Sequence, residues 1–166
     1  SLTDFFVNKR ILMKINFLTV GKTSYPFVKE GCELYFNRLK HYTKLEEIVV
    51  EDVKKASKLS NEQLKQKEGE KILGKLNSQD FVVLLDEKGK TFNSVSFAKW
   101  IEQKQVQGTG TLVFIVGGAF GFSKEVYERA NMKLQLSSMT FSHQIIRSIF
   151  AEQLYRAFTI IKGEPY

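Results

Sequence analysis

The sequence is poor in residues that cross-link chains or bind metals. Its 166 residues include one cysteine, two histidines, two prolines and one tryptophan. The single cysteine, Cys32, excludes an internal disulfide, and with only two histidines beside it the chain lacks the ligand set of a structural zinc site. No apolar run approaches the roughly 20 residues that a membrane-spanning helix needs. These absences predict a cytoplasmic protein without a metal.

The remaining composition is typical of a globular protein. Hydrophobic residues make up 43% of the sequence and charged residues 26%, and the length suits a single domain. We expect that domain to run from Met13 to Tyr166, with residues 1–12 as a short leader. The formal net charge of +7 favours a polyanionic partner such as nucleic acid, although such a balance is also common among small proteins.

Apolar runs of strand length alternate with segments of helical period. The predicted strands are Lys14–Val20, Leu45–Val50, Phe81–Asp86, Thr111–Val116 and Lys133–Leu136. The predicted helices are Pro26 to about Lys40, Asn61–Leu76, Ser94 to about Gln105, Ser123–Ala130 and Ser142–Ile161. Strict alternation requires crossover connections, so the pattern predicts an α/β fold with a mostly parallel sheet and helices on both faces.

Glycines follow two of the predicted strands. Gly21-Lys22-Thr23 is similar to the end of a phosphate-binding loop, but Asn16 stands where that motif needs a glycine, which excludes it. Gly117-Gly118 lies between a strand and Ser123, a predicted helix N-cap. The spacing is not that of a dinucleotide-binding loop. A tight turn and a ligand loop are equal alternatives here, because open α/β sheets bind ligands beyond the carboxyl ends of their strands.

Three polar segments have both a functional and a simpler interpretation. The carboxylates of Leu85–Gly89 could orient a ligand or form a solvated turn. Leu136–Gln144 could form a small surface that binds adenine. His143 is expected in the first turn of the following helix, where the helix dipole favours a neutral imidazole. The simpler interpretation is that His143 caps the helix or packs against its neighbours. The stretch Glu51–Gly69 is expected to be a solvated loop and an exposed helix face, with RNA contact by its lysines as the alternative.

The last predicted helix is apolar around more than one stripe, which predicts burial against the sheet and against a second subunit. Its apolar residues are Ile145, Ile146, Ile149, Phe150, Leu154, Ala157, Phe158 and Ile161. Arg147 in such a helix needs a partner such as a carboxylate or a phosphate. Glu152 and Arg156 are spaced to form a helix ion pair.

Taken together, several segments are similar to one family. They are Met13-Lys14-Ile15, Gly21-Lys22, Leu85–Lys90, Phe114–Gly121, Leu136–Phe141, His143-Gln144, Arg147, Glu152–Ala157 and Gly163–Tyr166. From Met13 to Tyr166 the sequence resembles the RlmH family of ribosomal large-subunit pseudouridine methyltransferases, in the SPOUT superfamily. Members of this family commonly continue a little past the Pro-Tyr pair, so further residues are expected beyond Tyr166.

The resemblance implies an α/β fold with a C-terminal trefoil knot that binds S-adenosylmethionine (SAM), and a homodimer. It implies methyl transfer to N3 of a pseudouridine in 23S rRNA, within the assembled 70S ribosome, without a metal or a membrane. The cofactor contacts that it implies are Leu85, Gly117, Gly118, Leu136, Ser137, Ser138, Met139, Thr140 and Phe141.

The candidates near the methyl acceptor are His143, Arg147, Arg156 and Tyr166. An arginine could stabilise the negative charge that develops on the base or bind a phosphate. His143 or Tyr166 could help to remove the N3 proton. Two alternatives stay open: a knotted methyltransferase that acts on tRNA, and a ribosome-binding or assembly protein that has lost catalysis.

Overall fold

A computed structural model describes residues 13–166; the expected leader, residues 1–12, lies outside the described residues. Its centre is a five-stranded sheet in the order β2-β1-β4-β3-β5, in which every adjacent pair is parallel. The strands are β1 (Lys14–Val20), β2 (Lys44–Val50), β3 (Phe81–Thr91), β4 (Thr111–Val116) and β5 (Met132–Gln135). The predicted α/β fold with a parallel sheet is confirmed.

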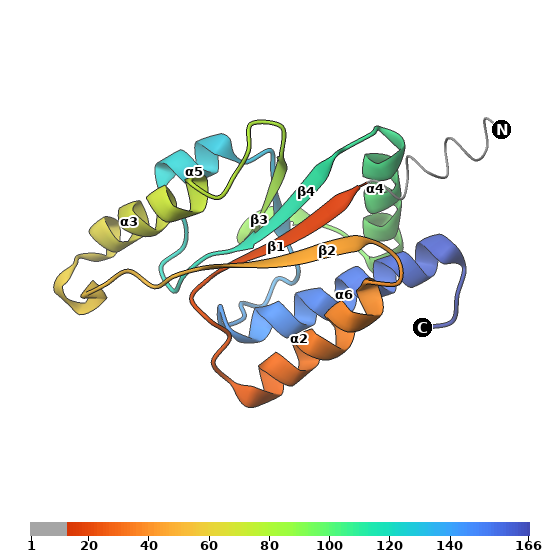
Figure 1. Ribbon diagram of the computed structural model, residues 1–166, viewed down its shortest axis with the longest axis horizontal. Helices are drawn as coiled ribbons and strands as arrows, with labels where there is room; N and C mark the ends of the chain where they lie inside the picture. The colour runs from red at the N-terminus through yellow and green to blue at the C-terminus, as the bar shows by residue number, and fades with distance from the viewer. Residues whose placement is uncertain (1–12) are drawn as a thin grey trace.

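Helices cover both faces of the sheet (Figure 1). One face carries α2 (Pro26–Leu39), α4 (Ser94–Val106) and α6 (Ile145–Lys162), and the other carries α3 (Asn61–Leu73) and α5 (Lys124–Arg129). A short 3-10 helix, η1 (Ala56–Lys58), precedes α3. Among the described residues, no helix has both the length and the apolar character needed to cross a membrane.

The two faces have separate hydrophobic cores, because successive side chains of a strand point to opposite sides of the sheet. On β4, Leu112, Phe114 and Val116 belong to the core under α2, α4 and α6, whereas Val113 and Ile115 belong to the core under α3 and α5. Burial on both faces explains why the strands are near-continuous apolar runs.

Aromatic packing fixes α6 over the middle of the sheet. The Phe150 ring lies 4.7 Å from that of Phe114 on β4 and 5.5 Å from that of Phe17 on β1, measured between ring centroids. All three side chains are buried. The start of α6 is therefore held close to the carboxyl ends of the central strands.

The structure corrects three sequence predictions. Strand β3 continues to Thr91, because Lys90 and Thr91 pair with β5 after a bulge that follows Leu85. Helix α6 begins at Ile145 rather than Ser142. Within the stretch that was expected to be solvated, Glu68 and Gly69 of α3 are buried.

The turn before α6 is held by hydrogen bonds of two residues. The side chain of Gln144 binds the loop between β1 and α2: its Oε1 accepts a hydrogen bond from the backbone N–H of Ser24 at 2.9 Å, and its Nε2 donates to the carbonyl of Lys22 at 3.1 Å. Ser142 Oγ accepts one from the backbone N–H of Ile145 at 3.1 Å. His143 lies in this turn, directly before the helix.

Gly89 lies where the end of β3 passes over β5. A Cβ atom built on Gly89 would lie 2.5 Å from the backbone nitrogen of Leu134 and 2.6 Å from the carbonyl carbon of Lys133. Because backbone atoms cannot yield as a flexible side chain can, Gly89→Ala is expected to lower the free energy of unfolding by about 1–3 kcal/mol, measured by urea denaturation. Gly110→Ala is the control, since its Cβ would meet nothing within 4 Å; equal losses in both variants would contradict the prediction.

Candidate functional site

Three segments converge on one cavity beside the bulge of β3 and the carboxyl ends of β4 and β5. Its walls are residues 85–88 at the β3 bulge, residues 116–122 at the end of β4 and after it, and most residues from Leu134 near the end of β5 to Ile146. The cavity has a volume of about 510 Å³, within the range of small-molecule sites. The sequence indicated these segments separately, and the parallel sheet brings their ends to a single edge.

Most of the predicted cofactor residues lie on this cavity. Those in its wall are Leu85, Gly117, Gly118, Leu136, Ser137, Met139, Thr140 and Phe141. Ser138 is not a lining residue, although both of its neighbours are. The wall combines apolar side chains with hydroxyl and carboxylate groups, as a ligand with a flat ring and a polar tail requires.

The paired glycines are tightly packed on the side that faces the protein. A Cβ on Gly117 would lie 2.9 Å from the Phe122 ring, and one on Gly118 would lie 2.6 Å from the Glu68 carboxylate. Both glycines also line the cavity. The two alternatives for this motif therefore coexist: a close turn against neighbouring segments, and a backbone wall of a ligand-sized cavity.

Asp86 and Tyr127 form a polar pair in the cavity wall. The Tyr127 hydroxyl donates a hydrogen bond to Asp86, whose other carboxylate oxygen accepts one from the backbone N–H of Lys88 at 2.8 Å. Burial and the nearby Asp86 carboxylate raise the pKa of Tyr127. No sequence pattern indicated Tyr127, because α5 brings it to the cavity only through the tertiary fold.

His143 lines the cavity from the turn before α6. Burial and the positive charge of Arg147 lower the pKa of His143, against a smaller opposing effect of Asp52. The imidazole is therefore neutral at neutral pH and has a lone pair that can accept a proton. A neutral ring was the expectation, and burial is the largest cause of the lowered pKa.

Arg147 is fully buried, and its hydrogen-bond partners are not those expected. Its Nη1 donates to the Gly21 carbonyl at 2.8 Å and to Thr23 Oγ1 at 3.1 Å, and its Nη2 donates to the Val20 carbonyl at 2.9 Å. Its Nε donates to the His143 carbonyl at 3.0 Å. The expectation of a carboxylate or phosphate partner was wrong, and the guanidinium is not a lining group of the cavity.

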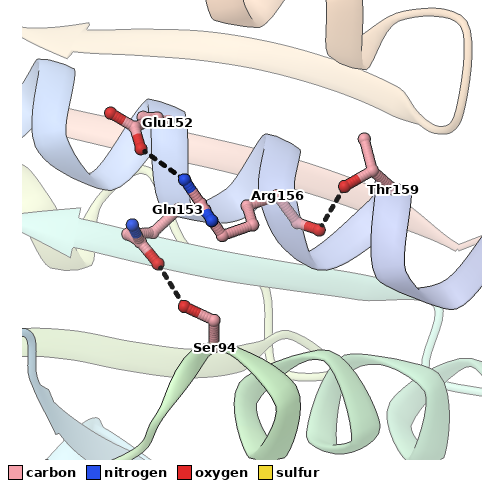
Figure 2. Close-up of polar contacts among 5 residues, drawn as sticks. All are labelled: Ser94, Glu152, Gln153, Arg156 and Thr159. Carbon is pink, nitrogen blue, oxygen red and sulfur yellow. Dashed lines mark hydrogen bonds and ion pairs between the residues drawn. The ribbon is translucent and has the colours of Figure 1, made fainter. Parts of the chain in front are cut away.

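Arg156, farther along α6, and Tyr166, in the segment that follows α6, lie outside the cavity wall. Figure 2 shows Arg156 reaching back to Glu152, with which it forms the predicted ion pair at 3.5 Å. The Tyr166 ring lies 3.6 Å from the Arg156 guanidinium carbon, measured to the ring centroid. Burial of the hydroxyl and contacts with Glu152 and Tyr35 raise the pKa of Tyr166 to about 12, so the phenol is protonated at neutral pH.

The four candidates for the acceptor side thus divide into two places within one chain. His143 lies on the cavity, and Arg147 lies directly behind it. Arg156 lies beside Glu152 on α6, and the Tyr166 ring packs on Arg156 from the segment after the helix. This part of α6 is joined to α4 by a 3.0 Å hydrogen bond from Ser94 to Gln153 (Figure 2).

Comparisons with known proteins agree on one family. The family described as "Predicted SPOUT methyltransferase" matches residues 13–166. Ribosomal RNA large subunit methyltransferase H of Christiangramia forsetii is 49% identical over 154 residues, and the alignment covers 93% of this chain and 98% of the relative. The proteins of the same name from Parabacteroides distasonis and Flavobacterium johnsoniae are 50% and 46% identical, with the same coverage.

The hydrogen bonds of Arg147 predict a structural role that a substitution can measure. Lysine keeps the positive charge but cannot reach all four acceptors, so Arg147→Lys is expected to lower the free energy of unfolding by about 2–4 kcal/mol. Arg156→Lys, on the same helix, is the matched control and is expected to change it by less than about 1 kcal/mol, because the ion pair with Glu152 is only half-buried. Urea denaturation of both variants measures the difference, and equal stabilities would contradict this role.

Proposed function

Because the chain belongs to the SPOUT methyltransferase family, we propose that it transfers a methyl group from SAM to N3 of a pseudouridine in 23S rRNA, within the assembled 70S ribosome. The convergence of the β3 bulge and of the segments after β4 and β5 on one cavity carries this proposal. The relatives named as methyltransferases of the large-subunit ribosomal RNA, which align with 93% of the chain, support the choice of substrate.

The residues of the cavity fit SAM in size and chemistry. Leu85, Leu136 and Phe141 offer apolar surface to a purine ring, and the Asp86–Tyr127 pair offers oxygens to hydroxyl and amino groups. The residues proposed to hold the cofactor are Leu85, Gly117, Gly118 and residues 136–141, of which Ser138 is exposed and not part of the lining. When bound, SAM supplies a methyl carbon that is activated by the adjacent sulfonium.

The protein's contribution to catalysis is then alignment and removal of one proton. An in-line displacement needs the base nitrogen held opposite the leaving sulfur, and a preformed cavity wall supplies that order before reaction. Neutral His143 is the proposed acceptor of the N3 proton, because it lines the cavity and its lowered pKa keeps a lone pair available. Arg147 is proposed as a positioning residue that fixes the His143 backbone.

A homodimer is part of the proposal. Exposed apolar side chains gather at the start of α2, at the start of α6 and on the adjoining loop: Phe27, Leu34, Met139, Phe141 and Ile145. The close approach of Gly31 to Ser148 joins α2 to α6 here. A second copy that covers this surface would bury it and bring further residues toward the cavity. Arg156 and Tyr166, which do not reach the cavity of their own chain, are candidates for that role.

The cavity by itself does not select the RNA, so two alternatives are kept for the test. One is methylation of tRNA, and the other is binding to the ribosome without catalysis. The net charge of +7 predicts weak, salt-sensitive binding to free RNA, so that recognition depends on the shape of the ribosome.

We also propose that the protein acts in the cytoplasm, because its proposed substrate is the ribosome.

The proposed reaction can be measured with labelled SAM. Purified protein is incubated with 70S ribosomes that lack the modification, with 50S subunits and with bulk tRNA, and the methylated nucleotide is then mapped. The expected result is transfer to a 23S pseudouridine in 70S ribosomes; ribosomes that already carry this methyl group are the matched control and should accept none. Transfer to tRNA alone would contradict the substrate, and absence of both SAM binding and transfer would favour the non-catalytic alternative.

A further inference from the structure

A buried carboxyl group lies directly behind the glycine wall of the cavity. Glu68, on α3, is only 7% exposed, and its Oε1 has no hydrogen-bond partner within residues 13–166. Its two carboxylate oxygens would lie 2.6 and 2.8 Å from a Cβ atom built on Gly118. Since Gly118 also lines the cavity, the carboxyl group and a bound ligand are separated by the backbone of one residue.

The packing of α3 forces Glu68 into this position. Gly69 presses against Ser123, the N-cap of α5, so closely that a Cβ atom on Gly69 would collide with the Ser123 hydroxyl. The absence of a side chain at both Gly69 and Gly118 thus allows α3 to lie against the cavity loop. The Glu68 carboxyl group is held between them and has little freedom to swing out to solvent.

No cation of the described chain forms an ion pair with Glu68. Lys71, one turn along α3, donates instead to the carbonyls of Glu51 and Asp52. Burial, and the negative charge of Asp52, raise the pKa of Glu68. An unpaired buried carboxylate destabilises the folded protein, so the charged form of Glu68 is disfavoured unless a positive charge comes from outside the chain.

We propose that Glu68 is a positioning residue that selects SAM, with its positively charged sulfonium, over the neutral thioether product, S-adenosylhomocysteine (SAH). This role rests on the function proposed above. The two ligands differ by one methyl group and one positive charge at sulfur. A negative charge behind the glycine wall attracts the positively charged sulfonium of SAM. Once the methyl group has moved to the RNA base, the sulfur is neutral and this attraction is lost, which favours release of SAH.

The test is the ratio of affinities for SAM and SAH, measured by isothermal titration calorimetry on the full chain. Glu68→Gln removes the charge and keeps the size of the side chain. It is expected to lower the preference for SAM over SAH by at least about threefold relative to the unsubstituted protein. Glu70→Gln is the matched control, because Glu70 is on the same helix and exposed; it should leave the ratio unchanged.

A merely structural role would give a different result. If Glu68→Gln weakened the binding of SAM and SAH equally, or changed the ratio of their affinities by less than about threefold, the inference would be overturned. Glu68→Asp, which keeps the charge, is expected to keep the preference for SAM. In thermal unfolding without ligand, the Glu68→Gln variant is expected to be at least as stable as the unsubstituted protein. If the Glu68→Gln variant does not fold, Glu68→Ala is used to measure the affinity ratio.

The two proposals fail in distinguishable ways. An unsubstituted protein that bound neither SAM nor SAH would contradict the proposed function, and the role of Glu68 with it. A protein that bound both ligands, with the same ratio in Glu68→Gln, would contradict the role of Glu68 alone.

Discussion

The burial of one charged group constrains the whole site. Arg147 has no exposed surface, so its donors must be satisfied inside the protein. The carbonyls of Val20 and Gly21, at the end of β1, and the carbonyl of His143 accept these hydrogen bonds. Segments more than 120 residues apart in the sequence are thereby joined at one point. The turn before α6, and with it one wall of the cavity, is placed relative to the sheet.

The opposite wall is held by close contacts of glycines. Gly69 lets α3 rest on the cap of α5, Gly118 lies against Glu68, and Gly117 lies against the Phe122 ring. Because both walls are fixed by contacts within the protein, the cavity exists before any ligand arrives. Such order suits a displacement reaction, in which alignment of the two reacting atoms supplies much of the rate. Glu68 lies behind this wall, and its Oε1 has no hydrogen-bond partner within residues 13–166; its carboxylate charge would complement a cationic cofactor.

The sequence predicted the fold class and the segments of the site well, because these depend on local pattern. Alternating strand and helix periods indicated a parallel sheet, and Ser123 was predicted as the helix cap that it is. Three features depended on contacts between distant segments and were not predictable: the carbonyl partners of Arg147, the burial of Glu68 and the arrival of Tyr127 at the cavity. The trefoil knot came from the family resemblance alone and stays a prediction, since no periodicity reveals the threading of a chain.

The proposed SAM site is the cavity beside the β3 bulge and the carboxyl ends of β4 and β5. Hydrogen–deuterium exchange of the backbone amides, with and without SAM, tests it most directly. If SAM binds there, exchange slows in residues 85–88, 117–122 and 134–143, and is unchanged around the hollow at the opposite ends of the strands, which residues 78–81 and 108–111 line. Protection confined to that opposite hollow, or none at saturating SAM, would contradict it.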